Sequence, residues 1–282
     1  NSCEIIFTKG TTDSINLVAN GYRSLLKKGN EIIISEMEHH SNIVPWQMCC
    51  EDSGATLKVI PILDNGDLDI EAFENLLSKK TKLVAITHIS NALGTINPIE
   101  KIITATHKVG AKILIDGAQA TPHTSVNVQG LDVDYYCFSA HKMYGPKGIG
   151  ALYVRRKPKV QLEAEMHGGG HERGMRSGTL ATHQIVGLGA AAQLASQRLD
   201  DDREHYSALS QLFLEKLLAE PGIKLNGHAS HRVPNIMNIS FANVEGELLL
   251  MSLKDLAISS GSACTSASVE PSYVLRAIGL AD

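Results

Sequence analysis

Lys142 is the residue whose type and position most directly suggest covalent chemistry. It follows the apolar run 135–138 through Ser139-Ala140-His141, and glycines at 145 and 148 come shortly after it. An amine directly after a buried strand is poorly placed for a solvated face, and desolvation lowers the pKa of a lysine. Such an amine can form a Schiff base with a carbonyl compound. On the residues alone, a lysine with only a structural role remains the alternative.

Further polar groups follow the other predicted strands, at the places where ligands bind in an open parallel sheet. They include two imidazoles, a carboxylate and two amides: His39, His40, Asp116, Asn91 and Gln119. Near the N-terminus, Gly10-Thr11-Thr12-Asp13 opens a helix whose amides and hydroxyls suit a phosphate. Together with Lys142, these groups predict a site for a phosphorylated cofactor that contains nitrogen.

Each of these features also has a structural interpretation. Residues 10–13 would serve as an ordinary helix N-cap, Asp116 as a turn carboxylate and His39 as a packed core histidine. The cysteines at 3, 49, 50 and 137 are interpreted as packing residues. His167 and His171 flank three glycines, but no further ligand cluster accompanies them, so we predict no metal site.

Alternating strands and helices must position these groups. Apolar runs predict strands at 31–35, 57–61, 83–88, 112–115, 135–138 and 147–154. Helical patterns lie between them at 13–28, 69–78 and 100–109. This alternation predicts βαβ units and an α/β fold whose mainly parallel sheet is covered on both faces.

The pattern changes towards the C-terminus and predicts a second, smaller α+β unit. Residues 184–199 are Ala-rich and helical, and apolar residues then recur at helical spacing from 206 to 217. Residues 235–241 indicate a strand and 247–254 a helix. We therefore expect a large domain at 1–200 and a small domain at 201–282, packed as one body because no linker separates them.

Composition and charge exclude several classes of protein. The 282 residues are 43% hydrophobic and 20% charged, which is typical of globular rather than disordered or fibrous chains. A formal net charge of −4 gives no strong field for nucleic acid or an anionic membrane. The longest apolar runs, such as 248–253, are too short to span a bilayer. Five cysteines without a CxxC pair argue against a disulfide scaffold and favour a reducing, cytoplasmic setting.

Three segments resemble the cysteine desulfurases, the NifS/IscS/SufS enzymes of the class V aminotransferase family. The segments are SAHKMYGPKGIG at 139–150, which resembles the lysine motif that binds pyridoxal 5'-phosphate, MHGGGHERGMRSGT at 166–179, and SSGSACTSAS at 259–268. The resemblance runs through the whole chain. It implies the type I fold of the transferases that use pyridoxal phosphate, with a large and a small domain as in aspartate aminotransferase.

By that resemblance, Lys142 holds the cofactor covalently, Asp116 pairs with its protonated pyridine nitrogen and Gln119 bonds its phenolic oxygen. His39 stacks on the ring and assists proton transfer, and Asn91 lies beside the same ring. The residues implied for the phosphate are Thr11, Thr12, Ser139, His141 and, from a neighbouring subunit, Thr179. The last role implies a homodimer.

The resemblance also implies the reaction. Cys264 lies in a small, polar segment that is typical of a mobile loop and could carry a thiolate. It would take the sulfur of L-cysteine as a persulfide and leave L-alanine. The sulfur would pass to a scaffold or carrier protein for iron–sulfur clusters or tRNA thiolation. A selenocysteine lyase, and a catalytically silent fragment or interaction protein, are the alternatives.

Two further expectations follow from comparing the chain with the family pattern. Residues 1 to about 140 resemble the SufS type, for example MEHHSNIVPWQM at 37–48, whereas residues from about 147 resemble the IscS type. We therefore expect a hybrid of the two types. We also expect a chain truncated at both ends, because the arginine that binds the substrate carboxylate in the family would lie beyond Asp282.

Overall fold

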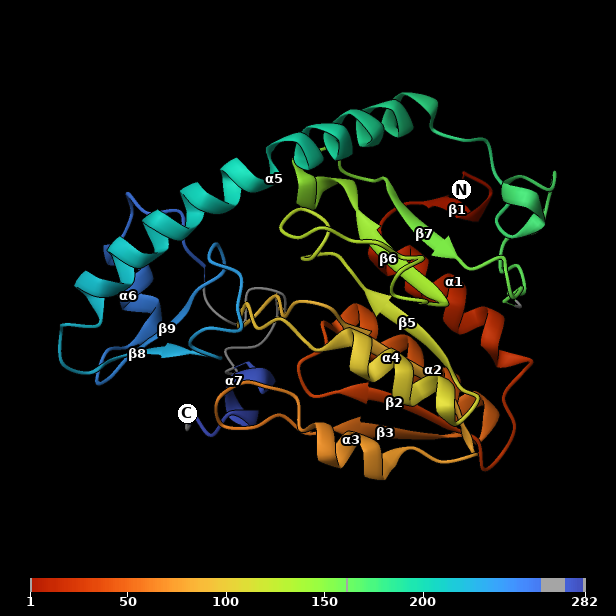
Figure 1. Cartoon of the computed structure of the whole chain (residues 1–282), viewed down its shortest axis with the longest axis horizontal. Coiled ribbons are helices and arrows are strands. Elements are labelled where there is room, and N and C mark those ends of the chain that lie inside the picture. Colours follow the sequence, from red (N-terminus) through yellow and green to blue (C-terminus); the bar gives the residue numbers. More distant parts are fainter. Residues whose placement is uncertain (1, 161, 260–271, 281–282) are drawn as a thin grey trace.

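A seven-stranded sheet forms the centre of the computed structural model, which describes residues 2–160, 162–259 and 272–280 (Figure 1). Its strands are β1 (Ile5–Thr8), β2 (Glu31–Ser35), β3 (Thr56–Ile60), β4 (Thr81–Thr87), β5 (Lys112–Asp116), β6 (Tyr135–Ser139) and β7 (Gly150–Val154). They lie in the order β1-β7-β6-β5-β4-β2-β3. The pairs among β2 to β6 are parallel, and β7 is antiparallel to both of its neighbours. The predicted α/β fold with a mainly parallel sheet is confirmed.

Helices cover both faces of this sheet. They are α1 (Thr11–Arg23), α2 (Val44–Ser53), α3 (Ile70–Leu76) and α4 (Ile99–Lys108). Ile32 and Ile34 of β2 pack in one core cluster with residues of α1 and α2, whereas Ile33 packs in a second cluster with residues of α3 and α4. Because successive strand side chains point to opposite faces, a strand buried on both sides must be apolar throughout.

The cysteines at 49, 50 and 137 are buried packing residues, as the sequence predicts. Cys49 and Cys137 are inaccessible to solvent and Cys50 is nearly so. Burial raises the pKa of the Cys50 thiol to about 11. A thiol with so high a pKa is a weak nucleophile at neutral pH.

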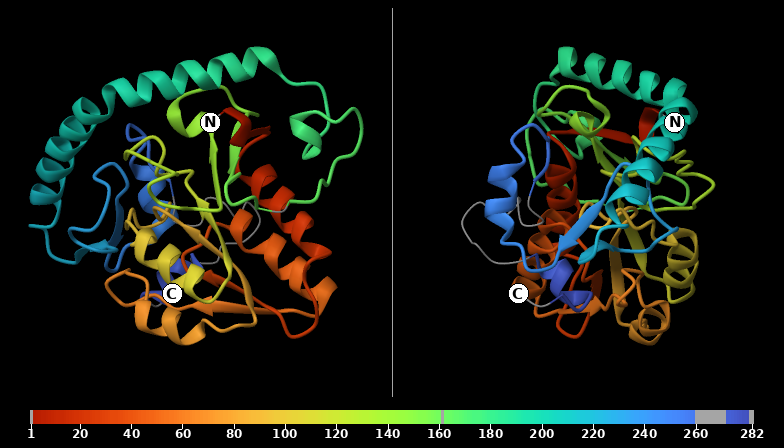
Figure 2. Two further views of the ribbon diagram at one scale, coloured as in Figure 1. Left: turned by 45° about the vertical axis from the view of Figure 1, so that its right-hand side comes forward. Right: turned by 90° about the vertical axis from the view of Figure 1, so that its left-hand side faces the viewer.

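A single long helix, α5 (Thr182–Leu217), leads away from the sheet (Figures 1 and 2). The two helical patterns predicted at 184–199 and 206–217 are parts of it. It reaches a two-stranded sheet of β8 (Ile223–Asn226) and β9 (Asn238–Phe241), beside which lies α6 (Gly246–Ser252). The division into domains at residue 200 stays a prediction, and residue 200 lies inside α5.

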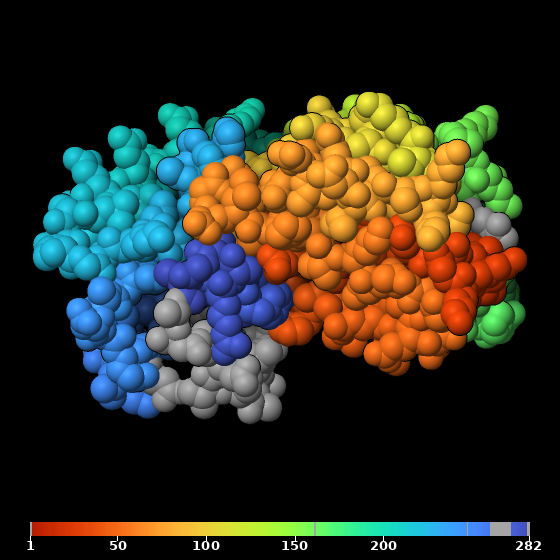
Figure 3. All heavy atoms as spheres, turned by 90° about the horizontal axis from the view of Figure 1, so that it is seen from below, coloured from red at the N-terminus to blue at the C-terminus, as the bar shows by residue number. Residues whose placement is uncertain are grey.

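The last described helix, α7 (Tyr273–Ala277), returns to the large sheet. Val274 and Ile278 are buried in the cluster that contains Ile60 and Ile62. Seen from below, α7 in dark blue lies beside the orange segment of β3 and α3 (Figure 3). The chain therefore crosses from the β8–β9 unit back to the carboxyl ends of the parallel strands before it ends.

One edge of the sheet is covered by side chains. The short 3-10 helix η4 (Glu172–Gly174) lies along β1, where the N–H of Phe7 donates to Glu172 Oε1 at 3.2 Å. The guanidinium of Arg173 donates to the carbonyl of Ile5. These two contacts satisfy main-chain groups of β1 that no described strand pairs. None of the helices in 2–160, 162–259 and 272–280 has both the length and the apolar character that a membrane span requires.

Candidate active site

The carboxyl ends of four parallel strands bring the candidate residues to one edge of the sheet. Asp116 ends β5 and pairs in register with Thr87 of β4 and with Cys137 of β6. Ser139 ends β6, and His39 follows β2 by four residues. Because the strands are parallel, residues that are distant in sequence meet where the strands end.

The start of α1 contacts the end of β6. The N–H of Thr11 donates to Ser139 Oγ at 2.8 Å, and the two hydroxyl oxygens lie 2.9 Å apart. Gly10, the N-cap residue, has φ 148° and no side chain of its own to cap the helix, so the hydroxyl of Ser139 accepts the first amide. Two hydroxyls at the positive end of a helix whose N-cap residue lacks a side chain form a suitable site for an anion.

Glycines allow the main chain of β7 to lie close to the segment before α1 and to β6. A Cβ on Gly150 of β7 would lie 2.6 Å from Gly10 Cα and 2.4 Å from the carbonyl oxygen of Phe138. Both of these atoms are main-chain atoms, so neither can swing aside. Any residue larger than glycine at 150 would therefore displace the segment that leads into α1.

Asp116 is a buried carboxyl group, 4% exposed, that accepts the N–H of Ala118 at 2.9 Å. Burial raises the pKa of Asp116 to about 6, while the bond from Ala118 and the charge of Lys142 oppose that rise. A positively charged ligand group beside Asp116 would stabilise its ionised form. Gln119 lies half-buried in the turn that follows.

Lys142 lies on the 3-10 helix η3 (Ala140–Met143), directly after β6. The expectation of a desolvated amine was wrong for the protein alone, because η3 leaves the sheet and Lys142 is exposed. The charge of Lys142 nevertheless opposes the rise in the pKa of Asp116 and contributes, after burial, to lowering the pKa of His39 and of His141. The amine therefore lies within electrostatic reach of all three.

His39 is held in one orientation by Ser41. Its Nδ1 accepts the N–H of Ser41 at 3.1 Å and lies 2.8 Å from the Ser41 hydroxyl. The proton of the neutral ring must then be on Nε2. Burial, with the charges of His40 and Lys142, lowers the pKa of His39, so the ring is neutral at neutral pH.

The remaining candidates are not joined to this group by the contacts that the structure describes. Asn91 lies exposed in the turn after β4, Thr12 and His141 are exposed beside Thr11 and Lys142, and Thr179 is exposed on the segment before α5. The role expected for Thr179 involves a second subunit and stays a prediction. Cys264 lies outside the described residues.

A buried pair behind Asp116 is a feature that sequence reasoning missed. His88 Nδ1 and the Tyr136 hydroxyl lie 3.0 Å apart, and burial lowers the pKa of His88 to about 4. A Cβ on Gly117 would lie 2.0 Å from Cε1 of the Tyr136 ring. Tyr136 therefore supports the turn that carries Gln119. The sequence did not predict this role, because Tyr136 lies in an apolar run typical of a core strand.

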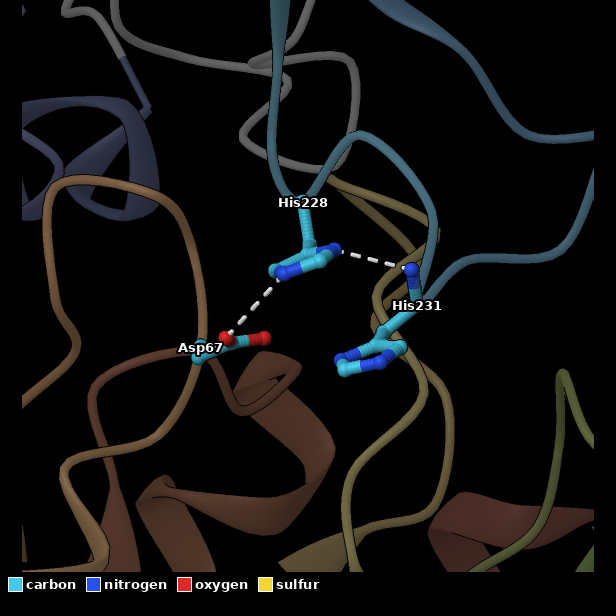
Figure 4. A group of neighbouring side chains, drawn as sticks. All are labelled: Asp67, His228 and His231. Carbon is cyan, nitrogen blue, oxygen red and sulfur yellow. Dashed lines mark hydrogen bonds and ion pairs between the residues drawn. The ribbon is translucent and has the colours of Figure 1, made fainter.

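Asp67, His228 and His231 form the group of possible metal ligands among the described residues (Figure 4). His228 Nε2 lies 3.6 Å from Asp67 Oδ2, and the two rings stack with centroids 4.2 Å apart. His228 Nδ1 accepts the N–H groups of Ser230 at 3.1 Å and His231 at 2.8 Å. The neutral ring therefore carries its proton on Nε2, the atom that would have to bind the metal. The arrangement of these three residues is better explained as a contact between two loops than as a metal site.

The chain is similar in sequence to one protein family over nearly its whole length. The Aminotransferase class-V family matches residues 1–279. Cysteine desulfurase IscS of Photobacterium profundum is 48% identical and that of Pseudoalteromonas translucida 46% identical, each over 280 residues that cover 99% of this chain and 69% of the relative. The expected split into SufS-like and IscS-like halves stays a prediction.

Solved structures agree in fold. A NifS-like protein superposes with a TM-score of 0.89 at 30% identity, covering 99% of this chain and 74% of that chain. The apo structure of a cysteine desulfurase from Thermococcus onnurineus NA1 superposes with a TM-score of 0.88 at 29% identity, covering 99% and 73%. Similarity in sequence and in fold thus extends over nearly all of this chain.

Proposed function

This chain belongs to the cysteine desulfurases of the class V aminotransferase family, and from that premise we propose that it converts L-cysteine to L-alanine with pyridoxal 5'-phosphate and retains the sulfur as a persulfide on Cys264. The observation that carries the proposal is the grouping of Asp116, Lys142 and His39 at one edge of the sheet. An acid, an amine and an imidazole there supply the three proton-handling groups that the chemistry needs.

The residues present fit the cofactor. The start of α1, where Gly10 carries no capping side chain, suits its phosphate together with the hydroxyls of Thr11 and Ser139. Glycines at 10 and 150 keep that corner free of side chains. A buried carboxyl such as Asp116 gains most from a cationic partner, and a protonated pyridine nitrogen is one.

Each residue has a definite task in this proposal. Lys142 binds the cofactor covalently and afterwards carries the proton that leaves the substrate Cα. Asp116 remains ionised beside the pyridine nitrogen and so keeps that nitrogen protonated. His39 covers the ring and presents its Nε2–H, and Gln119 and Asn91 contact the ring substituents. When bound, pyridoxal phosphate supplies an electron sink for the electron pair left at Cα.

Sulfur transfer uses Cys264. Its thiolate forms an S–S bond with the substrate sulfur while the Cβ–S bond of the substrate breaks. The electron pair of the broken bond stays with Cβ, which takes up a proton to become the methyl group of alanine. The persulfide on Cys264 then passes its outer sulfur to an acceptor thiol.

The wider setting belongs to the same proposal. We place the protein in the cytoplasm as a homodimer in which Thr179 contacts the phosphate bound to the other subunit. Its acceptor is a scaffold for iron–sulfur clusters or a carrier for tRNA thiolation, with no direct contact with nucleic acid or membrane. The names of the relatives support the reaction, and Cys264 in a polar segment supports transfer to another protein.

The test combines the cofactor with three variants. Protein incubated with pyridoxal phosphate should turn yellow, and borohydride should fix the label on Lys142, as found by peptide mapping. Lys142→Ala should abolish this label, whereas Lys147→Ala, at an exposed lysine five positions on, should retain it. Cys264→Ala should bind the cofactor but form no persulfide from L-cysteine. A label on another lysine, or persulfide formed by Cys264→Ala, would contradict the proposal.

A further inference from the structure

Glu38, the residue before His39, is a carboxyl group without access to solvent. Its Oε1 accepts the hydroxyl of Ser35 at 2.6 Å and the N–H of Thr87 at 3.0 Å. Its Oε2 accepts the side-chain amide of Asn42 at 2.6 Å. One side chain thereby joins the end of β2, the end of β4 and the 3-10 helix η2 (His40–Asn42).

Trp46 fixes the direction of these hydrogen bonds. Its Nε1–H donates to Asn42 Oδ1 at 2.8 Å, and both side chains are fully buried. An indole can only donate, so the carbonyl of the Asn42 amide must face Trp46. The NH₂ of Asn42 must then face Glu38, and only an acceptor at position 38 satisfies it.

The main chain around His39 is held from the other side as well. The hydroxyl of Tyr273 on α7 donates to the carbonyl oxygen of Glu38. The Tyr273 ring meets the His40 ring edge-on, with centroids 5.1 Å apart. His39 therefore lies between two neighbours that are both anchored, and Ser41 fixes the rotation of its ring.

From this geometry we propose that Glu38 is a positioning residue, whose hydrogen-bond network with Ser35, Thr87 and Asn42 sets the place of the His39 ring at the cofactor edge. The proposal rests on the proposed function, because the task of His39 on the cofactor is part of it. Glu38 acts through His39 and touches neither cofactor nor substrate.

The direction of the bonds suggests a pair of complementary substitutions. In Glu38→Gln, the amide oxygen can still accept from Ser35 and Thr87, but the new NH₂ faces the NH₂ of Asn42. In Asn42→Asp, a second buried carboxyl group faces Oε2 of Glu38, and only a proton held between the two can bridge them. In the double variant, the new amide at position 38 donates to the new carboxylate at position 42, whose other oxygen still accepts from Trp46. The double variant restores every bond with one direction reversed and keeps one carboxyl group and one amide in the pair.

The first measurement needs no cofactor. The ¹⁵N NMR spectrum of the imidazoles in the apoprotein, with the His39 signal assigned through His39→Gln, should show the form protonated at Nε2. Each single variant should change the tautomer or titration of His39, and the double variant should restore it. Glu51→Gln, at an exposed carboxyl on α2, is the matched control and should leave the signal unchanged.

The second measurement is the rate of alanine formation by the protein loaded with pyridoxal phosphate. Misplacing a reacting group by about 1 Å costs on the order of a hundredfold, so the kcat of each single variant should fall by that order with KM little changed. The double variant should recover most of kcat. A protein without desulfurase activity would refute the proposed function, while the NMR measurement would still decide the positioning of His39.

Two results would overturn the proposal. One is a single variant that folds and keeps both the His39 signal and the rate of the unaltered protein. The other is a double variant that folds without recovering the His39 signal. If the single variants do not fold, the His39 signal of the double variant alone tests the proposal, because every hydrogen bond of the network has a donor and an acceptor in that variant.

Discussion

The main-chain N–H of Thr11 and the hydroxyl of Ser139 meet in a hydrogen bond of 2.8 Å, although 128 residues separate them in the chain. The bond connects the first turn of α1 with the last residue of β6. Both residues are buried, at 7% and 4% exposure. The corner proposed for the phosphate is therefore already assembled in the protein alone.

Replacing Ser139 with alanine tests this corner. The change leaves the buried N–H of Thr11 without its acceptor, which costs about 1–3 kcal/mol. We expect Ser139→Ala to lower the free energy of unfolding by that amount and to weaken pyridoxal phosphate binding, as followed by absorbance titration. Ser207→Ala, which removes an exposed hydroxyl on α5, is the control. Unchanged binding in Ser139→Ala would remove Ser139 from the phosphate site.

Gly150→Ala should affect the same corner through main-chain packing. The added Cβ would approach both Gly10 Cα and the carbonyl of Phe138 to less than 3 Å, and forced overpacking costs about 1–3 kcal/mol. We expect a lower urea midpoint together with weaker cofactor binding.

The matched control for that change is Gly189→Ala within α5, where an added Cβ meets nothing within 4 Å. Alanine is more favourable than glycine inside a helix by about 0.5–1 kcal/mol, so this variant should unfold at a higher urea concentration. Equal midpoints for the two variants would show that the approach of β7 to Gly10 is not constrained.

Asp134 should make the protein sensitive to acid. Its fully buried carboxylate accepts from His107 Nε2 at 2.8 Å, Lys112 Nζ at 3.1 Å and the N–H of Ile113 at 3.0 Å. These partners lower the pKa of Asp134. A carboxyl with a lowered pKa stabilises the fold above its unfolded pKa of about 3.9, and this contribution is lost as the pH falls through the folded value.

Asp134→Asn should therefore destabilise the protein by about 3 kcal/mol at neutral pH, the order found when one partner of a buried pair is removed. The difference from the unaltered protein should shrink as the pH falls below the unfolded pKa. Urea unfolding at several pH values measures both curves. A difference that does not depend on pH would mean that Asp134 contributes no charge.

The buried carboxyl groups of the site should have the opposite effect. Burial raises the pKa of Asp116 to about 6 and that of Glu38 to about 8. The folded apoprotein then holds protons that the unfolded chain releases above about pH 4. Their contribution is complete below the unfolded pKa and is lost as the pH rises through about 6 and about 8.

Asp116→Asn should accordingly flatten the decline in stability between about pH 4 and about pH 6. The raised pKa of Asp116 changes the free energy of unfolding by on the order of 3 kcal/mol across this range, at about 1.4 kcal/mol per unit of pKa shift. The free energy of unfolding of the apoprotein, measured across this range, gives the slope. Equal slopes in the variant and the unaltered protein would show that Asp116 is ionised throughout.

Much of the fold could be predicted because burial on both faces leaves a simple pattern. The apolar run 31–35 coincides with β2, since every residue of that strand is buried. β1 was missed because its four residues become a strand only through pairing with β7, far along the chain. The continuity of α5 was concealed by Asp200-Asp201-Asp202, three acidic residues that a solvated helix tolerates.

The part of the candidate site that lies at the ends of strands could be predicted from the sequence. Asp116 and Ser139 come directly after apolar runs and His39 four residues after one, and parallel pairing brings such positions together. The network of Glu38 was not predictable, because its donors lie on three elements whose proximity is set by tertiary packing. The exposure of Lys142 depends on the turn of η3, which the apolar pattern does not encode.

The contacts of Glu172 and Arg173 with β1 also bear on how the protein behaves at high concentration. An open strand edge is a template on which another chain can add a strand and begin aggregation. Here two side chains occupy the outer N–H of Phe7 and carbonyl of Ile5, the positions that an incoming strand would need. The sheet thus resists edge-to-edge growth at β1, where side chains from η4 cover the strand.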